Sequence, residues 1–109
     1  MGDRLADAPC TAIVAYEVDP DDCDLFLESW RRANSHLADQ PGLVSTTLHR
    51  ATSANPRFRF VNVANWETGD AFRAATLSVA FQEASGELSA YPIAASVYEV
   101  LENGPTSAE

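Results

Sequence analysis

The chain has 109 residues, of which 16 are acidic and 7 are basic, and its formal net charge is −9. This length suits one domain, and a hydrophobic fraction of 46% is enough for a packed core. Nucleic-acid binding needs clustered basic residues, so the acidic composition excludes that partner. No apolar run approaches the ~20 residues of a membrane span, and the first nine residues lack a signal-peptide core. We expect one cytoplasmic domain over 1–109, with an ordered core at about 10–101 and flexible termini.

Cysteines and histidines are scarce in this sequence. Cys10 and Cys23 are too few for a disulfide-stapled secreted domain, and their spacing matches no zinc site. We expect both to be free, buried thiols, with a disulfide between them as the alternative. The histidines are His36 and His49 only, so one chain cannot build a multi-histidine metal site. We therefore predict no metal ion and no cofactor.

The first half of the chain predicts a strand, a helix and a strand. Residues 10–18 are apolar and β-branched, which is typical of a strand. Asp19 is a good N-cap and Pro20 suits the first helical position, so a helix is expected from there to about Asp39. The Pro-Gly pair at 41–42 ends this helix, and residues 43–50 are predicted as the second strand. The helix has an apolar stripe with steps of three and four, into which Asn34 also falls: Cys23, Phe26, Leu27, Trp30, Ala33 and Leu37.

The second half predicts a hairpin partner, two helical segments and a last strand. Residues 57–66 form the clearest strand and pair with 43–50 through a polar loop. Thr68 is expected to cap a helix over 69–77, and Ser78 a second short helix to about Leu88. Residues 93–101 form the final strand. This order fits the α+β ferredoxin-like fold, a split βαβ arrangement with helices on one face of an antiparallel sheet.

Both faces of the predicted sheet carry apolar residues. A sheet that is apolar on both sides in so short a chain needs a second copy to cover its free face. We therefore expect a homodimer of the dimeric α/β barrel type. In residues 57–66 the even-numbered positions, which share one face of the strand, are Phe58, Phe60, Asn62, Ala64 and Trp66. The other face carries Val61 and Val63.

Asn62 lies in the middle of the clearest strand, on the side shared with Phe60 and Trp66. A buried amide needs hydrogen-bond partners or costs on the order of 1–3 kcal/mol. Asn62 is either satisfied within the core, by backbone or by a neighbour such as Asn34, or it holds a ligand oxygen in an aromatic pocket. His49, near the end of the second strand, is either a solvent-facing histidine or a proton acceptor at the pocket mouth, depending on strand register.

Three segments of the chain resemble the antibiotic biosynthesis monooxygenase family: the turn PGLVS at 41–45, the strand end FVNVANWET at 60–68, and the helix start AFR at 71–73. The similarity implies the ferredoxin-like fold. It also implies oxidation of a polycyclic aromatic phenol or anthrone to a quinone with molecular oxygen, without metal, flavin or haem. By the same resemblance the site lies between the sheet and the helices. There Asn62 bonds a substrate carbonyl or enolate, and Trp66 stacks on the planar rings.

Other residues complete the candidate site. Phe72 falls where quinone-forming relatives can carry a tyrosine, and we expect it to pack against substrate. Trp30 and Asn34 on the helix stripe, Phe60 on the strand, and Tyr91 near the expected cleft are further substrate-binding candidates. The basic residue that such relatives can place after the second helix has no counterpart, because residues 74–109 contain no Lys, Arg or His. Of the tyrosines, Tyr16 and Tyr98 could also line a pocket.

We expect a cofactor-independent monooxygenase whose partners are a small aromatic substrate and molecular oxygen. Two alternatives stay open: a polyketide cyclase or isomerase, and a non-catalytic dimer that binds a small ligand. Haem degradation, which the same fold supports, is disfavoured because it normally needs an axial histidine after the third strand. Residues 67–92 contain none.

Overall fold

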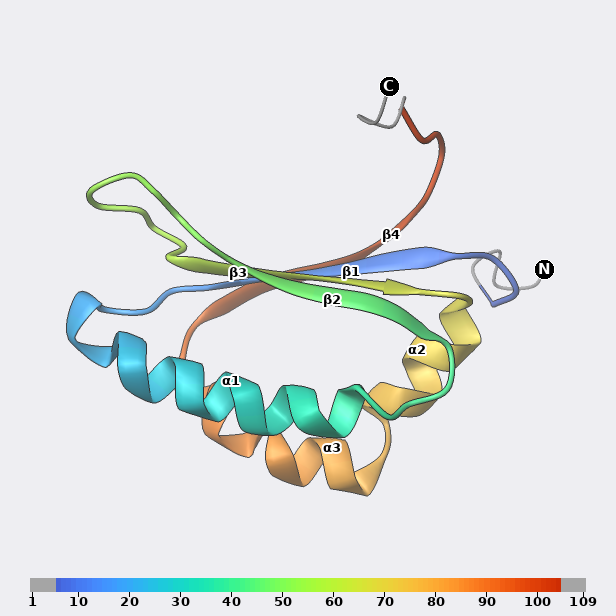
Figure 1. Ribbon diagram of the computed structural model, residues 1–109, viewed down its shortest axis with the longest axis horizontal. Helices are drawn as coiled ribbons and strands as arrows, with labels where there is room; N and C mark the ends of the chain where they lie inside the picture. Colours follow the sequence, from blue (N-terminus) through green and yellow to red (C-terminus); the bar gives the residue numbers. More distant parts are fainter. Residues whose placement is uncertain (1–5, 105–109) are drawn as a thin grey trace.

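The computed structural model describes residues 6–104 as a four-stranded antiparallel sheet with helices on one face (Figure 1). β1 (Cys10–Tyr16) and β3 (Phe60–Trp66) lie in the centre, and β4 (Ile93–Glu99) and β2 (Leu43–Arg50) form the edges. The strand order is β2-β3-β1-β4, and every neighbouring pair is antiparallel. This arrangement confirms the predicted α+β ferredoxin-like fold. Most of the predicted flexible ends lies outside the described residues.

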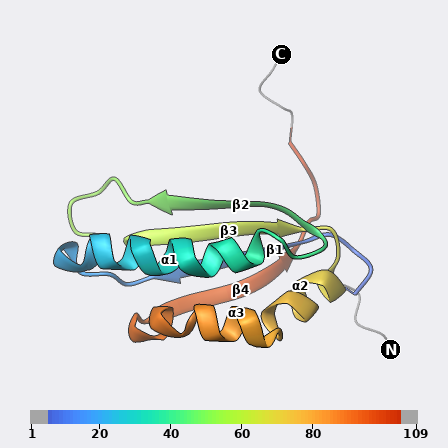
Figure 2. The same cartoon turned by 60° about the horizontal axis from the view of Figure 1, so that its bottom comes forward.

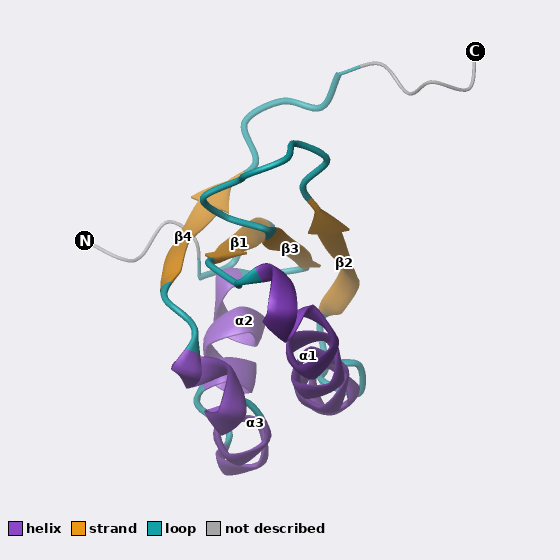
Figure 3. Ribbon diagram, turned by 90° about the vertical axis from the view of Figure 1, so that its left-hand side faces the viewer, coloured by secondary structure: helices purple, strands orange, loops and turns teal. Residues whose placement is uncertain are grey.

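The helices form a single layer against the sheet (Figures 2 and 3). α1 (Cys23–Leu37) connects β1 to β2, and α3 (Val79–Ala84) lies beside it on the β4 side of the molecule. α2 (Gly69–Thr76) follows β3 directly. The second short helix predicted to about Leu88 is divided, because a separate 3-10 turn, η2 (Gly86–Ala90), leads into β4.

Capping side chains set two of the helix starts. Thr68 and Ser78 cap α2 and α3 as predicted, each accepting a hydrogen bond from the backbone amide three residues later. Asp19 occupies the predicted N-cap position with Pro20 after it, but its side chain makes no capping hydrogen bond. A 3-10 turn, η1 (Pro20–Asp22), follows it instead, and α1 begins at Cys23. In this turn the Asp22 backbone amide donates to the backbone oxygen of Asp19, and the Asp19 carboxylate makes no capping bond.

The connection between β2 and β3 is longer than predicted. β3 begins at Phe60 and not at residue 57. Arg57 lies outside the ladder, where its Nε donates to Glu17 at 3.2 Å and its guanidinium carbon is 4.9 Å from the Phe58 ring centroid. These side-chain contacts hold the last part of the connection in place of strand pairing.

A β-bulge in β2 decides which of its side chains face the helices. The register shifts between Leu43 and Ser45, which leaves Val44 as the extra residue. The alternation of the strand reverses at this point. Thr46 therefore joins Leu43 on the helix-covered face, and His49 points to the opposite face.

The core is divided into two clusters along the sheet. The first surrounds Phe26, whose ring stacks on Phe60 at 4.6 Å and meets Tyr16 edge-on at 4.9 Å. The second surrounds Trp66 and includes the buried Cys10. Both cysteines are free thiols as predicted, although Cys23 is half-buried and not buried.

The face of the sheet opposite the helices is uncovered in this chain (Figure 3). Its central side chains include Ile13, Val61 and Val63, which are half-buried and apolar. Beside them Thr11 Oγ1 donates to Asn65 Oδ1 at 2.7 Å. In the described part of the chain, none of the helices combines the length and apolar character that crossing a bilayer requires.

Candidate active site

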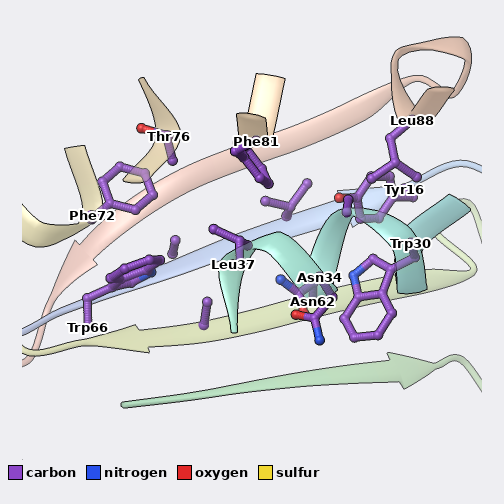
Figure 4. A pocket seen from close by; sticks show the side chains of 14 residues that line it. Tyr16, Trp30, Asn34, Leu37, Asn62, Trp66, Phe72, Thr76, Phe81 and Leu88 are labelled. Atoms are coloured by element: carbon purple, nitrogen blue, oxygen red, sulfur yellow. The ribbon is translucent and has the colours of Figure 1, made fainter. Parts of the chain in front are cut away.

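A cavity of about 100 Å³ lies between the sheet and the helices (Figure 4). Its lining draws on both core clusters, so the cavity fills the gap that separates them. β1 and β3 form the floor, α1 forms one wall, and α2, α3 and η2 form the other. The lining is mainly aromatic and aliphatic: Ala12, Val14, Tyr16, Trp30, Ala33, Asn34, Leu37, Asn62, Ala64, Trp66, Phe72, Thr76, Phe81 and Leu88.

Asn62 is held in one orientation by the neighbouring strand. Thr46 Oγ1, which the bulge turns to this face, donates to Asn62 Oδ1 at 3.0 Å. The Asn62 side chain is 8% exposed, and the predicted bond to Asn34 is not formed. Because the oxygen is committed to Thr46, the Nδ2 amino group is left without a partner among residues 6–104. It is available to donate hydrogen bonds to a bound molecule.

Two further polar atoms of the cavity residues are buried without a partner in the described chain. They are the Asn34 Oδ1, an acceptor, and the Trp66 Nε1, a donor. The Trp66 ring is 2% exposed and meets Phe72 edge-on with centroids 5.9 Å apart. Buried polar groups in proteins nearly always have partners, so these two atoms are exceptions within the described chain.

None of the lining residues is charged at neutral pH. Tyr16 is the one titratable group among the fourteen side chains that Figure 4 draws, and burial raises its pKa. The lining therefore offers hydrogen bonds and aromatic surface but no carboxylate, imidazole or amine. In the part of the chain that the structure covers, no three His, Cys, Asp or Glu side chains come together to hold a metal ion.

The cavity brings together five of the eight predicted site residues. Asn62 and Trp66 reach it from β3, and Trp30 and Asn34 reach it from α1. Phe72 reaches it from the first turn of α2, directly against the Trp66 ring. Residues from three separate elements thus meet at one place.

The other three predicted residues lie elsewhere. His49 is on the opposite face of the sheet, with Nδ1 3.3 Å from the Val61 backbone oxygen, because the bulge reverses the alternation of β2. Phe60 is 2% exposed and stacks on Phe26. Tyr91 meets the same Phe26 ring edge-on at 5.3 Å. Phe60 and Tyr91 therefore belong to the packing of the core and not to the cavity lining.

The sequence does not single out four residues that lie at or beside the cavity. The inward orientation of Thr46 depends on the bulge. Phe81 and Thr76 line the cavity, but in the sequence they are only parts of predicted helices. Tyr16 is one of several tyrosines that could line a pocket. Tyr16 has the same parity along β1 as the buried Cys10. This alternation predicts that the Tyr16 side chain faces the helices.

The fold and the cavity define a small ferredoxin-like protein with an uncharged, aromatic-walled cavity between its sheet and its helices. A family model described as "Antibiotic biosynthesis monooxygenase" matches residues 9–87. The chain therefore belongs to the antibiotic biosynthesis monooxygenase family, as the sequence motifs predicted. No curated protein matches the chain.

Solved structures similar to this one include oxygenases. A protein from Shewanella loihica PV-4 described as a "putative monooxygenase" is 28% identical, with a TM-score of 0.75, over 88% of this chain and 97% of that chain. A variant of SnoaB, a cofactor-independent oxygenase from Streptomyces nogalater, is 25% identical, with a TM-score of 0.78, over 93% and 100%. Rv0793 from Mycobacterium tuberculosis shares the fold at 14% identity, with a TM-score of 0.76, over 90% and 100%.

Proposed function

We propose that this protein is a cofactor-independent monooxygenase that oxidises a planar aromatic phenol or anthrone to a quinone with molecular oxygen. The observation that supports this most directly is the Asn62 amide, fixed by Thr46, in an uncharged cavity walled by aromatic rings. Family membership supports the monooxygenase class. The similarity to SnoaB, described as a cofactor-independent oxygenase, supports chemistry without a cofactor.

In the proposed reaction the substrate supplies the electrons. An anthrone anion passes one electron to oxygen, the two radicals combine to a peroxide at carbon, and loss of water leaves the carbonyl. The balance is R₂CH₂ + O₂ → R₂C=O + H₂O, so one oxygen atom enters the product and the other leaves as water. The protein has to stabilise the anion and hold the ring out of bulk water.

Each cavity residue has a role in this scheme. Asn62 donates to the substrate oxygen on which negative charge develops, and a fixed donor in a water-poor site lowers the free energy of that charge more than water does. Trp66 and Phe72 hold the plane of the rings. Because the lining holds no base, we propose that the substrate loses its proton to water at the cavity mouth and enters the reaction as an anion.

The test supplies the purified protein with anthrone and with 1-naphthol in air containing ¹⁸O₂ and a chelator. Oxygen uptake above the spontaneous rate, with one labelled atom in the product, is the expected result. Asn62→Ala should lower turnover by about 10²–10³-fold, the usual effect of removing one oxyanion donor. Asn65→Ala is the matched control, since Asn65 is on the same strand but bonds to Thr11 and Ser45 on the opposite face.

Other outcomes would contradict the proposal in distinct ways. A changed product without oxygen consumption would indicate a cyclase or isomerase. A rise in melting temperature with ligand but no turnover would indicate a binding module. Equal losses of turnover in Asn62→Ala and Asn65→Ala would remove the assigned role of Asn62.

We also propose that the protein is a cytoplasmic homodimer, with the uncovered sheet face as its interface. The apolar side chains of Ile13, Val61 and Val63 on that face support this, because a second sheet would remove them from water. The free thiols Cys10 and Cys23 agree with a reducing compartment. Sedimentation equilibrium should give twice the 11.8 kDa chain mass, and cell fractionation should place the protein in the cytoplasm. A monomer mass, or recovery outside the cytoplasm, would contradict the corresponding part.

A further inference from the structure

Tyr16 carries a hydroxyl group that core packing does not explain. Its ring lies edge-on to Phe26 with centroids 4.9 Å apart, a contact that a phenylalanine ring would make equally well. Tyr16 is 7% exposed, and among residues 6–104 its hydroxyl makes no hydrogen bond, although it is not one of the fully enclosed polar atoms that lack a partner. The hydroxyl is therefore accessible and free to donate a hydrogen bond to a molecule that enters the cavity.

Tyr16 lines the cavity close to Asn62. In the β1–β3 ladder Tyr16 pairs with Phe60 and Val14 pairs with Asn62, so Tyr16 and Asn62 are diagonal neighbours on one face. Such neighbours lie about 7–8 Å apart, a distance that an aromatic side chain can bridge. Figure 4 shows the Tyr16 hydroxyl oxygen directed into the cavity, toward the side where Leu37 lies. Both unpartnered donors therefore belong to residues that line one cavity.

We propose that the Tyr16 hydroxyl and the Asn62 amide form a pair of donors that bind one oxygen atom of a planar aromatic ketone or of its enolate. This deepens the proposed function and rests on it for the identity of the reacting molecule. A carbonyl oxygen has two lone pairs in the plane of its substituents, so it accepts two hydrogen bonds at once. One donor comes from each central strand, and the ring plane of the ligand then extends between Trp66 and the helices.

The cavity lining suits this ligand class better than carboxylates or phosphates. Carboxylates and phosphates are bound by Arg or Lys, and no lining residue is of either type. Burial raises the pKa of the Tyr16 hydroxyl, which keeps its proton at neutral pH and remains a donor. Neutral donors suit an oxygen that carries a partial charge in the ketone and a larger one in the enolate.

The test compares the bicyclic ketone 1-indanone with indane, the hydrocarbon of the same skeleton. Calorimetry measures the affinity of each ligand, and infrared difference spectra measure the carbonyl stretch of the bound ketone. Wild-type protein should prefer the ketone and lower its carbonyl frequency. Tyr16→Phe should weaken ketone binding by roughly 2- to 12-fold, leave indane binding unchanged and move the carbonyl band partway back. Tyr91→Phe is the control, since Tyr91 contacts the same Phe26 ring from outside the cavity.

An unmoved carbonyl band and unchanged ketone affinity in Tyr16→Phe would overturn the inference. If that variant does not fold, Asn62→Ala carries the test, because its bound ketone must keep a hydrogen-bonded carbonyl band. A free-carbonyl band there would equally overturn it. Neither measurement involves oxygen. Failure of oxygen uptake in wild-type protein would therefore refute the proposed function alone, and normal uptake with an unmoved band would refute only the role of Tyr16.

Discussion

Replacing Thr46 by valine tests whether Asn62 depends on a neighbour on the edge strand. The substitution keeps the shape and the β-branching of the side chain and removes only the hydroxyl that donates to Asn62 Oδ1 at 3.0 Å. Asn62 is 8% exposed, so water does not replace the lost donor easily. Leaving a buried acceptor unpaired costs about 1–3 kcal/mol of unfolding free energy. The amide also becomes free to rotate away from the substrate oxygen. A loss of about 1.4 kcal/mol of transition-state stabilisation would lower turnover about tenfold.

The assay combines urea denaturation with steady-state oxygen uptake. Two further variants distinguish a loss of turnover caused by a misoriented Asn62 amide from one caused by lower folding stability. Thr46→Ser keeps the hydroxyl and should recover most of the turnover. Thr11→Val breaks a similar bond, 2.7 Å from Thr11 Oγ1 to Asn65 Oδ1, on the face away from the cavity. It should lower stability without lowering kcat. Wild-type turnover in Thr46→Val, or equal turnover of Thr46→Val and Thr46→Ser, would refute the reasoning.

Two further substitutions address the turn before β2 and the wall of the cavity. Gly42 has a φ of 88°, and a Cβ there would lie 2.5 Å from Ala71 Cβ, so Gly42→Ala should lower the unfolding free energy by about 2–4 kcal/mol in urea titrations. Adding Ala71→Gly to this variant should recover only the part of the lost unfolding free energy that comes from the clash with Ala71. If Gly42→Ala alone changed the unfolding free energy by less than about 0.5 kcal/mol, the prediction would be contradicted. Glu87 accepts hydrogen bonds from Arg32 and Ser29, which hold the pKa of its carboxyl below the usual range. A lowered folded-state pKa gives stability that is present above the ordinary glutamate pKa and lost as pH falls through the folded one. Glu87→Gln should therefore flatten the melting-temperature profile on the acid side of the ordinary glutamate pKa, and parallel profiles would disprove it.

The order of strands and helices could be predicted because its signals are local. The stripe of α1 follows helical periodicity, and Thr68 and Ser78 cap the helices that follow them. The face of each β2 side chain could not be predicted in this way. It depends on Val44 being left out of the ladder, and that is decided by pairing with β3 and not by any residue of β2 alone. The same bulge explains why Thr46, and not His49, meets Asn62.

The candidate site was predictable to a similar extent. Asn62 and Trp66 share the inward alternation of β3, so the strand pattern alone puts both on the helix side. Phe60 shares that alternation too, yet it fills the core because Phe26 stacks on its ring. An inward aromatic residue lines the cavity only if it lies where the two core clusters leave a gap between them. That separation is set by contacts between elements far apart in the chain, such as Tyr91 on Phe26.

The composition of the cavity walls bears on how such a protein changes its preference during evolution. The floor consists of central strands that pair on both sides, so replacements there disturb the whole sheet. The wall opposite α1 is built from three short segments, and each contributes few side chains: Phe72 and Thr76, then Phe81, then Leu88. Exchanging one of these side chains would change the shape of the cavity without disturbing the central strands. The donors proposed on β1 and β3 would then keep their positions while α2, α3 and η2 vary.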